Sequence, residues 1–367
     1  MKSYAVTAVW LALMQSMFLG SAEEQCSVAI KDAELIEFPG VVETGRDPQS
    51  AGVVDCNSPA HWAGDTMYLF NSAAHPFRSS GPDVFHLSRP ATRVTFDNEA
   101  TWTMGARWIE ATHQADDEVL YMWYHNEPPV IPSKTAPRIG SMISKDNGLT
   151  WRDLGIVLEA PVDSNNLESV NFYFVGGNGD FCVVADQTHE YFYFFISTYN
   201  KVMREQGVSV ARMAYNDRDN PSGKILKWHE GEWKEPGVGG QVSPIFPAAG
   251  DWHSEGVDAF WGPSVHFNTH LNQWVMLLNR AKDKNWAQEG IYISFNEDLS
   301  KPVEWTKPTK ILDASQLKKS KWYPQVIGLG KQETDKLAGK TARLFVAGLS
   351  KWEIAFLRSG EEKRQGQ

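Results

Sequence analysis

The sequence predicts an all-β fold, a five-bladed β-propeller, from three observations. A unit of strand, polar turn and second strand occurs four times, and a shorter echo closes the chain. Apolar runs such as YFYFFIS and WVMLLN have the length of buried strands, and helical periodicity is hard to find. One N-terminal strand is left over. The four copies and the echo are Phe85–Phe96, Ser141–Leu158, Ala211–Trp228, Ile291–Leu312 and Glu353–Ser359.

The spacing of the unit favours propeller blades. Equivalent positions are Ser88, Ser144, Tyr215 and Ser294, which are separated by 56, 71 and 79 residues. A supersecondary unit that repeats at this period, in a chain of short strands, is typical of blades with four strands each. The repeated copies would be the outer pairs of these blades.

An inner pair of strands precedes each outer pair. The segments that would open the five blades are Asp55–Ser72, Ala106–Glu127, Gly179–Asn200, Phe260–Arg280, and Lys321–Leu329 with Ala342–Ser350. The last blade then lacks a fourth strand, while Ser27–Phe38 has no blade of its own. We expect that segment to pair with the last blade and close the ring, which removes an exposed sheet edge. Residues 23–360 would form one domain.

The N-terminus resembles an export signal. Lys2 precedes the apolar stretch Ala5–Leu19, and the small residues Gly20–Ala22 follow it. We expect residues 1–22 to be a signal peptide and the mature protein to be periplasmic or secreted. The apolar stretch is too short and too interrupted for a membrane span. The chain has three cysteines, so it can form at most one intramolecular disulfide.

The charge of the chain restricts its partners. The formal net charge is −10, which disfavours nucleic acid and anionic membranes as partners. An uncharged saccharide suits a negative protein, and the 15 Trp residues can supply aromatic faces for sugar rings. We expect a monomer with a carbohydrate substrate, without a cofactor and without a bound metal.

Propeller geometry brings certain residues together. First strands begin, and second strands end, on one face of the disc near its axis, so these positions converge on a central pocket. Carboxylates, His, amides and Trp there match the needs of sugar hydroxyls and a glycosidic bond. The candidates for substrate binding are Asn57, His61, His75, Trp108, His125, Glu127, Asp180, Asp258, Trp261, Arg280 and Tyr323.

In the Asp-led first strand, the WxxE-type opening of blade 2 and the repeat, the chain resembles the five-bladed glycosidases of the arabinanase, xylosidase and invertase clan. The resemblance covers about 300 residues at the level of architecture. It implies a glycoside hydrolase in which Asp55 is the base or nucleophile and Glu110 stands where the clan usually has an Asp that tunes pKa or holds hydroxyls. Glu255 is the nearest match to the general acid, ahead of Glu168, Asp180 and Asp258.

In such a pair Asp55 must be ionised. We therefore expect flanking amides or a cation to hold the pKa of Asp55 low, while burial keeps the partner acid protonated.

A second resemblance concerns a turn. The octapeptide Ser144–Trp151 matches the Asp-box of sialidases and other propellers, with Asp146, Gly148 and Trp151 in place. We expect a structural role on the face opposite the pocket: Asp146 binds turn amides, Gly148 takes a left-handed conformation, and Trp151 packs between blades.

Two other functions remain open. A non-catalytic carbohydrate-binding propeller would keep the aromatic residues and lack one of the two acids. A glycoside phosphorylase would keep one acid and add a basic phosphate pocket, for which Arg78, Arg107 and Arg280 are candidates. Each candidate also has a structural interpretation: a capping Asp, a hydrogen-bonded His, a core Trp. A sialidase is disfavoured, because its cluster of three Arg cannot be picked out.

Overall fold

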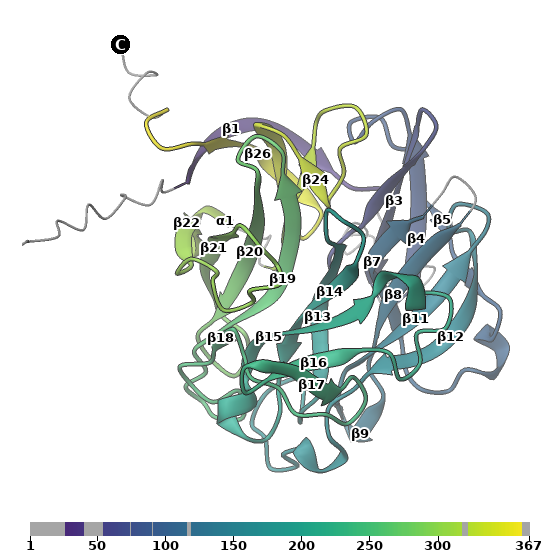
Figure 1. Cartoon of the computed structure of the whole chain (residues 1–367), viewed down its shortest axis with the longest axis vertical. Coiled ribbons are helices and arrows are strands. Elements are labelled where there is room, and N and C mark those ends of the chain that lie inside the picture. The colour runs from purple at the N-terminus through teal and green to yellow at the C-terminus, as the bar shows by residue number, and fades with distance from the viewer. Residues whose placement is uncertain are drawn as a thin grey trace, which may run out of the picture.

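The computed structural model describes residues 26–39, 54–73, 75–89, 91–115, 119–317 and 322–361. The expected signal peptide at residues 1–22 lies outside these ranges. The described strands form five large sheets that follow one another around the molecule (Figure 1). This is the predicted five-bladed β-propeller. No helix in the described ranges is long and apolar enough to cross a membrane.

Blades 1 and 2 come from the first half of the chain. In both, antiparallel strands run outward from the axis in sequence order. Blade 1 holds β2 (Ala60–Ala63), β3 (Thr66–Ala73), β4 (His75–Gly81) and β5 (Thr92–Arg93). Blade 2 holds β7 (Arg107–Gln114), β8 (Leu120–Asn126), β11 (Arg138–Ser144) and β12 (Thr150–Leu158), with β6 (Thr95–Phe96) parallel to β12.

Blades 3 and 4 repeat this order. Blade 3 holds β13 (Asn178–Ala185), β14 (Tyr191–Thr198), β15 (Gly207–Ala214), β16 (Leu226–His229) and β17 (Glu232–Pro236), and β18 (Phe246–Pro247) pairs with β15. Blade 4 holds β19 (Ala259–Asn268), β20 (Gln273–Ala281), β21 (Gln288–Asn296) and β22 (Thr309–Asp313), followed by the short helix α1 (Ala314–Leu317); β24 (Leu337–Ala338) lies parallel to β19.

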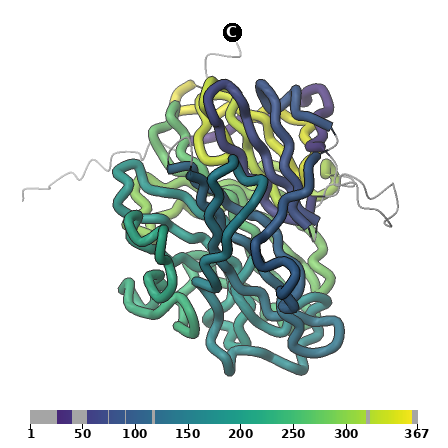
Figure 2. Tube along the Cα trace, turned by 90° about the vertical axis from the view of Figure 1, so that its right-hand side faces the viewer, coloured from purple at the N-terminus to yellow at the C-terminus, as the bar shows by residue number. Residues whose placement is uncertain are grey.

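The last blade uses both ends of the chain. It holds β23 (Pro324–Gly328), β25 (Thr341–Val346), β26 (Leu349–Leu357) and, outermost, β1 (Ser27–Glu37). Strand β1 pairs antiparallel with β26, from Ser27 opposite Leu357 to Glu37 opposite Leu349. This is the position that the sequence predicts for Ser27–Phe38. The purple N-terminal strand lies among the yellow C-terminal strands in both Figures 1 and 2.

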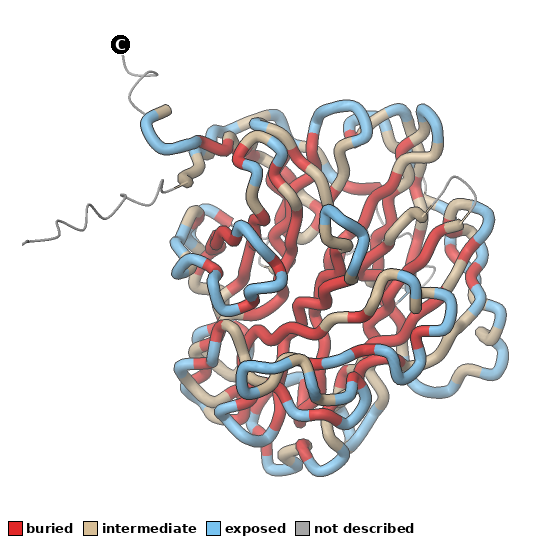
Figure 3. Tube along the Cα trace, in the orientation of Figure 1, coloured by how far each residue is buried: buried red, intermediate tan, exposed pale blue. Residues whose placement is uncertain are grey.

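Apolar side chains fill the space between neighbouring blades. Figure 3 shows that the central strands are largely buried. Between blades 5 and 1, for example, Ile327 and Phe345 share one cluster with Met67 and Leu69. Each such side chain, once buried, contributes about 1.5–3 kcal/mol. Because the last and first blades share a core, the ring is continuous.

Of the outer pair predicted for blade 1 at Phe85–Phe96, the first strand is wrong, while the second contains β5 (Thr92–Arg93), the fourth strand of the blade. The third strand is β4, the segment after Gly81 is irregular, and β6 pairs with β12 of blade 2 instead. Pro82 and Pro90 flank that segment, and proline cannot donate to a strand ladder. The other three outer pairs lie at β11–β12, β15–β16 and β21–β22, as predicted, and the shortened echo lies at β26.

The turn at Ser144–Trp151 joins β11 and β12. Asp146 Oδ1 accepts hydrogen bonds from the amides of Leu149 and Thr150, and Gly148 has φ of +80°. A Cβ at Gly148 would lie 2.3 Å from Phe70 of blade 1. Trp151 is buried against the same Phe70, with ring centroids 6.0 Å apart. The turn therefore joins blades 1 and 2.

Candidate active site

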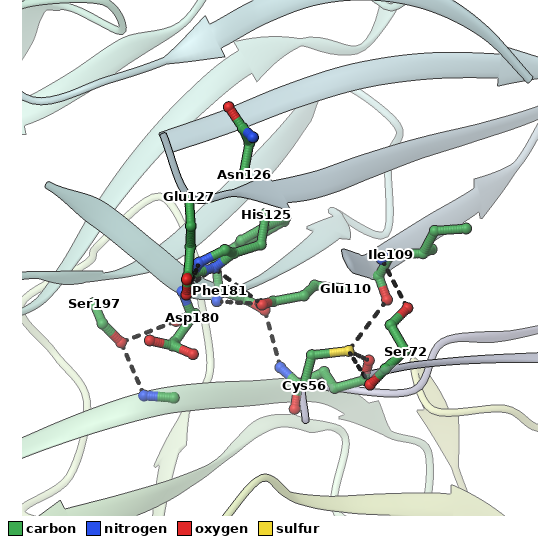
Figure 4. A network of polar contacts seen from close by, with 12 residues as sticks. Cys56, Ser72, Ile109, Glu110, His125, Asn126, Glu127, Asp180, Phe181 and Ser197 are labelled. Atoms are coloured by element: carbon green, nitrogen blue, oxygen red, sulfur yellow. Dashed lines mark hydrogen bonds and ion pairs between the residues drawn. The ribbon is translucent and has the colours of Figure 1, made fainter. Parts of the chain in front are cut away.

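A pocket near the axis gathers four carboxyl groups and one imidazole. It is lined by Asp55, Glu110, His125, Glu127 and Asp180, which come from blades 1, 2 and 3. Asp55 precedes β2, Glu110 lies early in β7, and Glu127 directly follows β8. Figure 4 shows Glu110, His125, Glu127 and Asp180 close together. First-strand starts and second-strand ends thus meet on one face, as predicted.

Aromatic side chains form the walls of the same pocket. These are Trp108, Tyr173, Phe174, Trp261, Trp286, Trp322 and Tyr323. Among the described lining residues there is no Lys or Arg. An aromatic pocket with convergent carboxyl groups suits sugar rings, whose apolar faces stack and whose hydroxyls bond carboxylates.

His125 connects the acids of blade 2 to blade 3. Its Nδ1 lies 3.2 Å from Glu110 Oε1 and accepts a hydrogen bond from the Asp180 amide at 3.1 Å. Burial disfavours a charged imidazole, but hydrogen bonds and charges of Glu110 and Glu127 raise the pKa of His125 well above its usual value. The Asp180 amide can donate only to an unprotonated nitrogen, so the contact geometry assigns the imidazole proton to Nε2, which lies 3.1 Å from Glu127 Oε1. The imidazole therefore orients Glu127 within the pocket.

Glu110 is buried below this imidazole. Its Oε2 accepts a hydrogen bond of 2.6 Å from the Phe181 amide, and only 1% of the residue is exposed. Burial raises the pKa of Glu110 to about 7. An ionised Glu110 oxygen 3.2 Å from an unprotonated Nδ1 would face its lone pair and be repelled, so a protonated Glu110 fits this contact better.

Asp180 is held in an unusual backbone conformation. It has φ of +42°, and the register of β13 against β14 shifts at this position. Its two carboxyl oxygens accept hydrogen bonds from the phenols of Tyr199 and Tyr323, at 2.5 Å and 3.0 Å. Tyr323 and Trp286 of the pocket also have positive φ. Such conformations cost free energy and concentrate at functional sites.

The expectation of a low pKa for Asp55 is wrong. Asp55 is exposed by its accessible surface, although many protein atoms lie around its carboxyl group. This burial, together with the charges of Glu127 and Asp180, raises the pKa of Asp55 to about 7. Among the described lining residues only His125 acts to lower it, and its effect is smaller than that of burial and the two acids.

Glu255 does not lie with these acids. Its side chain is 71% exposed and pairs with Lys284 at 2.9 Å. Glu168 is exposed as well, and neither residue lines the pocket. Both belong to connections between blades, whose course the strand pattern does not predict. The partner acid must therefore be sought among the carboxyl groups that do line the pocket.

Five other predicted site residues lie outside the lining. Asn57 is buried below the pocket, where its Nδ2 donates to the carbonyls of Phe181 and Pro263 in blades 3 and 4. His61 is buried against Tyr68 and Phe70, and burial lowers its pKa to about 4. His75 is exposed at the start of β4, and Asp258 forms a bidentate ion pair with Arg280.

The structure does not bring together the three arginines that the sequence suggested for a phosphate pocket. Arg78 donates to the carbonyls of Asp146 and Asn147, in the turn that joins β11 and β12. Arg107 lies over the rings of Phe96 and Trp102. Neither of these arginines, nor Arg280, lines the pocket.

Three lining residues escaped the sequence analysis, namely Tyr173, Phe174 and Trp286. They lie in the connections β12–β13 and β20–β21, whereas the propeller pattern predicts only which strand ends reach the pocket. The one signal was an isolated aromatic residue in a polar segment, KDKNWAQ around Trp286.

Glu110, His125 and Asp180 each offer a ligand atom within 4.8 Å of the others. These atoms are already engaged with the Phe181 amide, the Asp180 amide and two phenols. We therefore describe the group as a hydrogen-bonded network. No disulfide joins any of the three cysteines, all of which lie in the described ranges.

A larger cavity of about 660 Å³ lies between β1 and β22, at the outer edge of blades 4 and 5. Its lining mixes apolar side chains with polar and charged ones such as Asp32, Lys310 and Arg358. The axial pocket measures only about 100 Å³ but holds all four convergent acids, so the chemistry belongs there.

Comparisons with known proteins find likeness in structure only. No protein-family model matches the chain, and no curated protein matches it. Three of the similar solved structures are glycosidases. An exo-β-1,3-galactanase from Phanerochaete chrysosporium has a TM-score of 0.49 at 13% identity, covering 89% of this chain and 64% of the galactanase.

An α-L-arabinanase from Cellvibrio cellulosa has a TM-score of 0.46 at 13% identity, covering 82% of this chain and 91% of that chain. A xylan β-1,4-xylosidase from Bacillus halodurans has 0.42 at 10% identity, covering 83% and 52%. This chain thus spans less than two thirds of the length of the galactanase. At these identities and TM-scores, the likenesses assign no activity.

Proposed function

We propose that this protein is an exported, monomeric glycoside hydrolase that acts on a neutral oligo- or polysaccharide through carboxyl groups of the axial pocket. The observation that carries the proposal is the convergence of Asp55, Glu110, Glu127 and Asp180 inside an aromatic wall. Glycosidic hydrolysis needs a proton donor and a second carboxylate beside one bond. A pocket lined by acids and aromatic rings can supply both.

Asp55 is the proton donor in this proposal. With a pKa of about 7, it keeps a proton near neutral pH and can give it to the leaving oxygen. Glu127 supplies the second carboxylate, because its side chain is 28% exposed and His125 orients it. Glu110 and Asp180 are more deeply buried and act through charge and hydrogen bonds on these two. This reverses the role that the sequence suggested for Asp55.

A screen of aryl glycosides and polysaccharides tests the function. The wild-type protein should hydrolyse at least one, and Asp55→Asn should lower turnover by about 10²–10⁴-fold while sugar binding survives. Glu255→Gln is the matched control and should keep full activity, because this acid is exposed and paired with Lys284. Near-wild-type turnover in Asp55→Asn would remove Asp55 from the mechanism.

The same screen separates the alternatives. Binding of saccharides without any hydrolysis would favour the carbohydrate-binding propeller. Phosphate-dependent cleavage would favour a phosphorylase, which the lack of Lys and Arg among the described lining residues makes the weaker candidate.

The proposal of export depends on residues 1–22 of the sequence. The mass of the purified mature protein tests it, since cleavage after Ala22 predicts a chain that starts at Glu23.

A further inference from the structure

The axial pocket is too small to enclose a saccharide chain. It measures about 100 Å³, whereas pockets that enclose small ligands usually hold about 300–1,000 Å³. A bound saccharide of several rings would therefore place most of its atoms outside, against the rim. The rim must then supply further contacts.

One side of the rim presents exposed apolar side chains. Phe172 is 62% exposed, and its neighbours Val170 and Tyr173 are 42% and 38% exposed. A Phe side chain that stays in water gives up the free energy that its burial would contribute, about 1.5–3 kcal/mol. Contiguous exposed apolar groups on a folded protein mark sites of ligand or partner contact.

These side chains continue the aromatic wall of the pocket. The Phe172 and Tyr173 rings pack edge to face with centroids 4.8 Å apart. Tyr173 in turn contacts the rings of Trp286 and Trp322, at 5.6 Å and 6.2 Å. An aromatic surface thus runs from the carboxyl groups to the solvent-exposed Phe172.

The backbone holds this surface in place. The amides of Val170 and Phe172 donate to the carbonyls of His253 and Lys284, in two different connections around the pocket. The buried Asn171 accepts hydrogen bonds from the Tyr173 amide and from Trp286 Nε1. A contact surface that is already rigid loses little entropy when a ligand binds.

We propose that Phe172, with Tyr173, forms a stacking subsite for the sugar ring that follows the ring bound in the pocket. The proposal rests on the proposed saccharide function and adds that the natural ligand has at least two rings. The apolar face of the second ring would lie on the Phe172 ring, as sugar rings do on aromatic side chains.

Binding measured by calorimetry tests the subsite without any need for turnover. The probes are galactose with β-1,3-galactotriose, arabinose with arabinohexaose, and xylose with xylotriose. In wild type, at least one oligosaccharide should bind more tightly than its monosaccharide. Phe172→Ala should weaken that oligosaccharide about tenfold and leave the monosaccharide within about twofold. Phe172→Trp keeps an aromatic ring at this position and should bind the oligosaccharide about as tightly as wild type does.

Phe85→Ala is the matched control, because Phe85 is also an exposed phenylalanine (49%) and does not line the pocket. It should change neither affinity. An unchanged oligosaccharide affinity in Phe172→Ala, or an equal loss for both ligands, would overturn the subsite alone. If wild type binds none of the six sugars, the saccharide function fails and the subsite with it. If Phe172→Ala instead turns a dimer into a monomer in size-exclusion chromatography, Phe172 covers a second copy and the subsite is wrong.

Discussion

At the scale of single residues, the pKa of Asp55 determines how activity should depend on pH. A proton donor works only while it is protonated, and burial with nearby negative charge raises the pKa of Asp55 to about 7. We therefore expect kcat/KM for a hydrolysed glycoside to fall as pH rises through about 7. The measurement is a pH–rate profile. A rate that rises through this range would assign Asp55 the opposite role, that of base or nucleophile.

Glu110 links the site to stability. Its pKa rises from 4.5 to about 7 on folding, so the folded protein binds this proton more tightly than the unfolded chain does. The stabilisation of the folded protein that this proton provides is fully present below pH 4.5 and is lost as pH rises through about 7. Glu110→Gln imitates the protonated acid and should make the protein more stable than wild type at pH 8, by up to about 3 kcal/mol.

Urea denaturation at pH 5 and pH 8 measures this difference. The exposed Glu168→Gln serves as control and should follow wild type at both values. If Glu110→Gln is destabilising by the same amount at pH 5 and pH 8, Glu110 is ionised in the folded protein at both values and the assignment of its proton is wrong.

At the scale of elements, most strands were predictable from the sequence and connections were not. The alternation of strand residues and the repeated turn locate Glu110, His125 and Asp180 near the axis, because a blade fixes where each strand begins and ends. Tyr173 and Trp286 reach the pocket from irregular connections, whose course depends on contacts such as Asn171 with Trp286. Glu255 was misplaced for the same reason. The burial that raises the pKa of Asp55 likewise depends on residues distant in sequence.

The turn at Ser144–Trp151 should matter for stability and not for chemistry. Ser144 lies opposite Leu120, the first residue of β8, while the pocket lies at the far end of that strand. Trp151→Ala should cost about 3–5 kcal/mol by opening a cavity next to Phe70. Thermal unfolding measures the loss. Saccharide affinity of the folded fraction should be unchanged, and a stable variant without affinity would contradict the structural role.

At the scale of the whole molecule, the ring depends on pairing between the two ends of the chain. Strand β1 completes blade 5, and its inward side chains Val28 and Ile30 pack on the apolar cluster between blades 4 and 5. Without β1, the long edge of β26 would be unpaired, which favours aggregation. Closure thus covers the edge of β26 and also fills a core, so a disruptive substitution in β1 should destabilise every blade.

Ile30→Asp tests this dependence. The substitution places a charge against the apolar cluster, which should destabilise the whole domain by about 1–3 kcal/mol and lower its melting temperature in one cooperative step. Lys31→Ala changes the next residue of the same strand, whose side chain is 72% exposed and paired with Glu353. That control should stay within about 1 kcal/mol of wild type. If Ile30→Asp melts like the control, or if blade 5 alone unfolds while the other blades keep their hydrogen-exchange protection, β1 does not couple the ring. One shared transition would show that four blades depend on a strand that none of them contains.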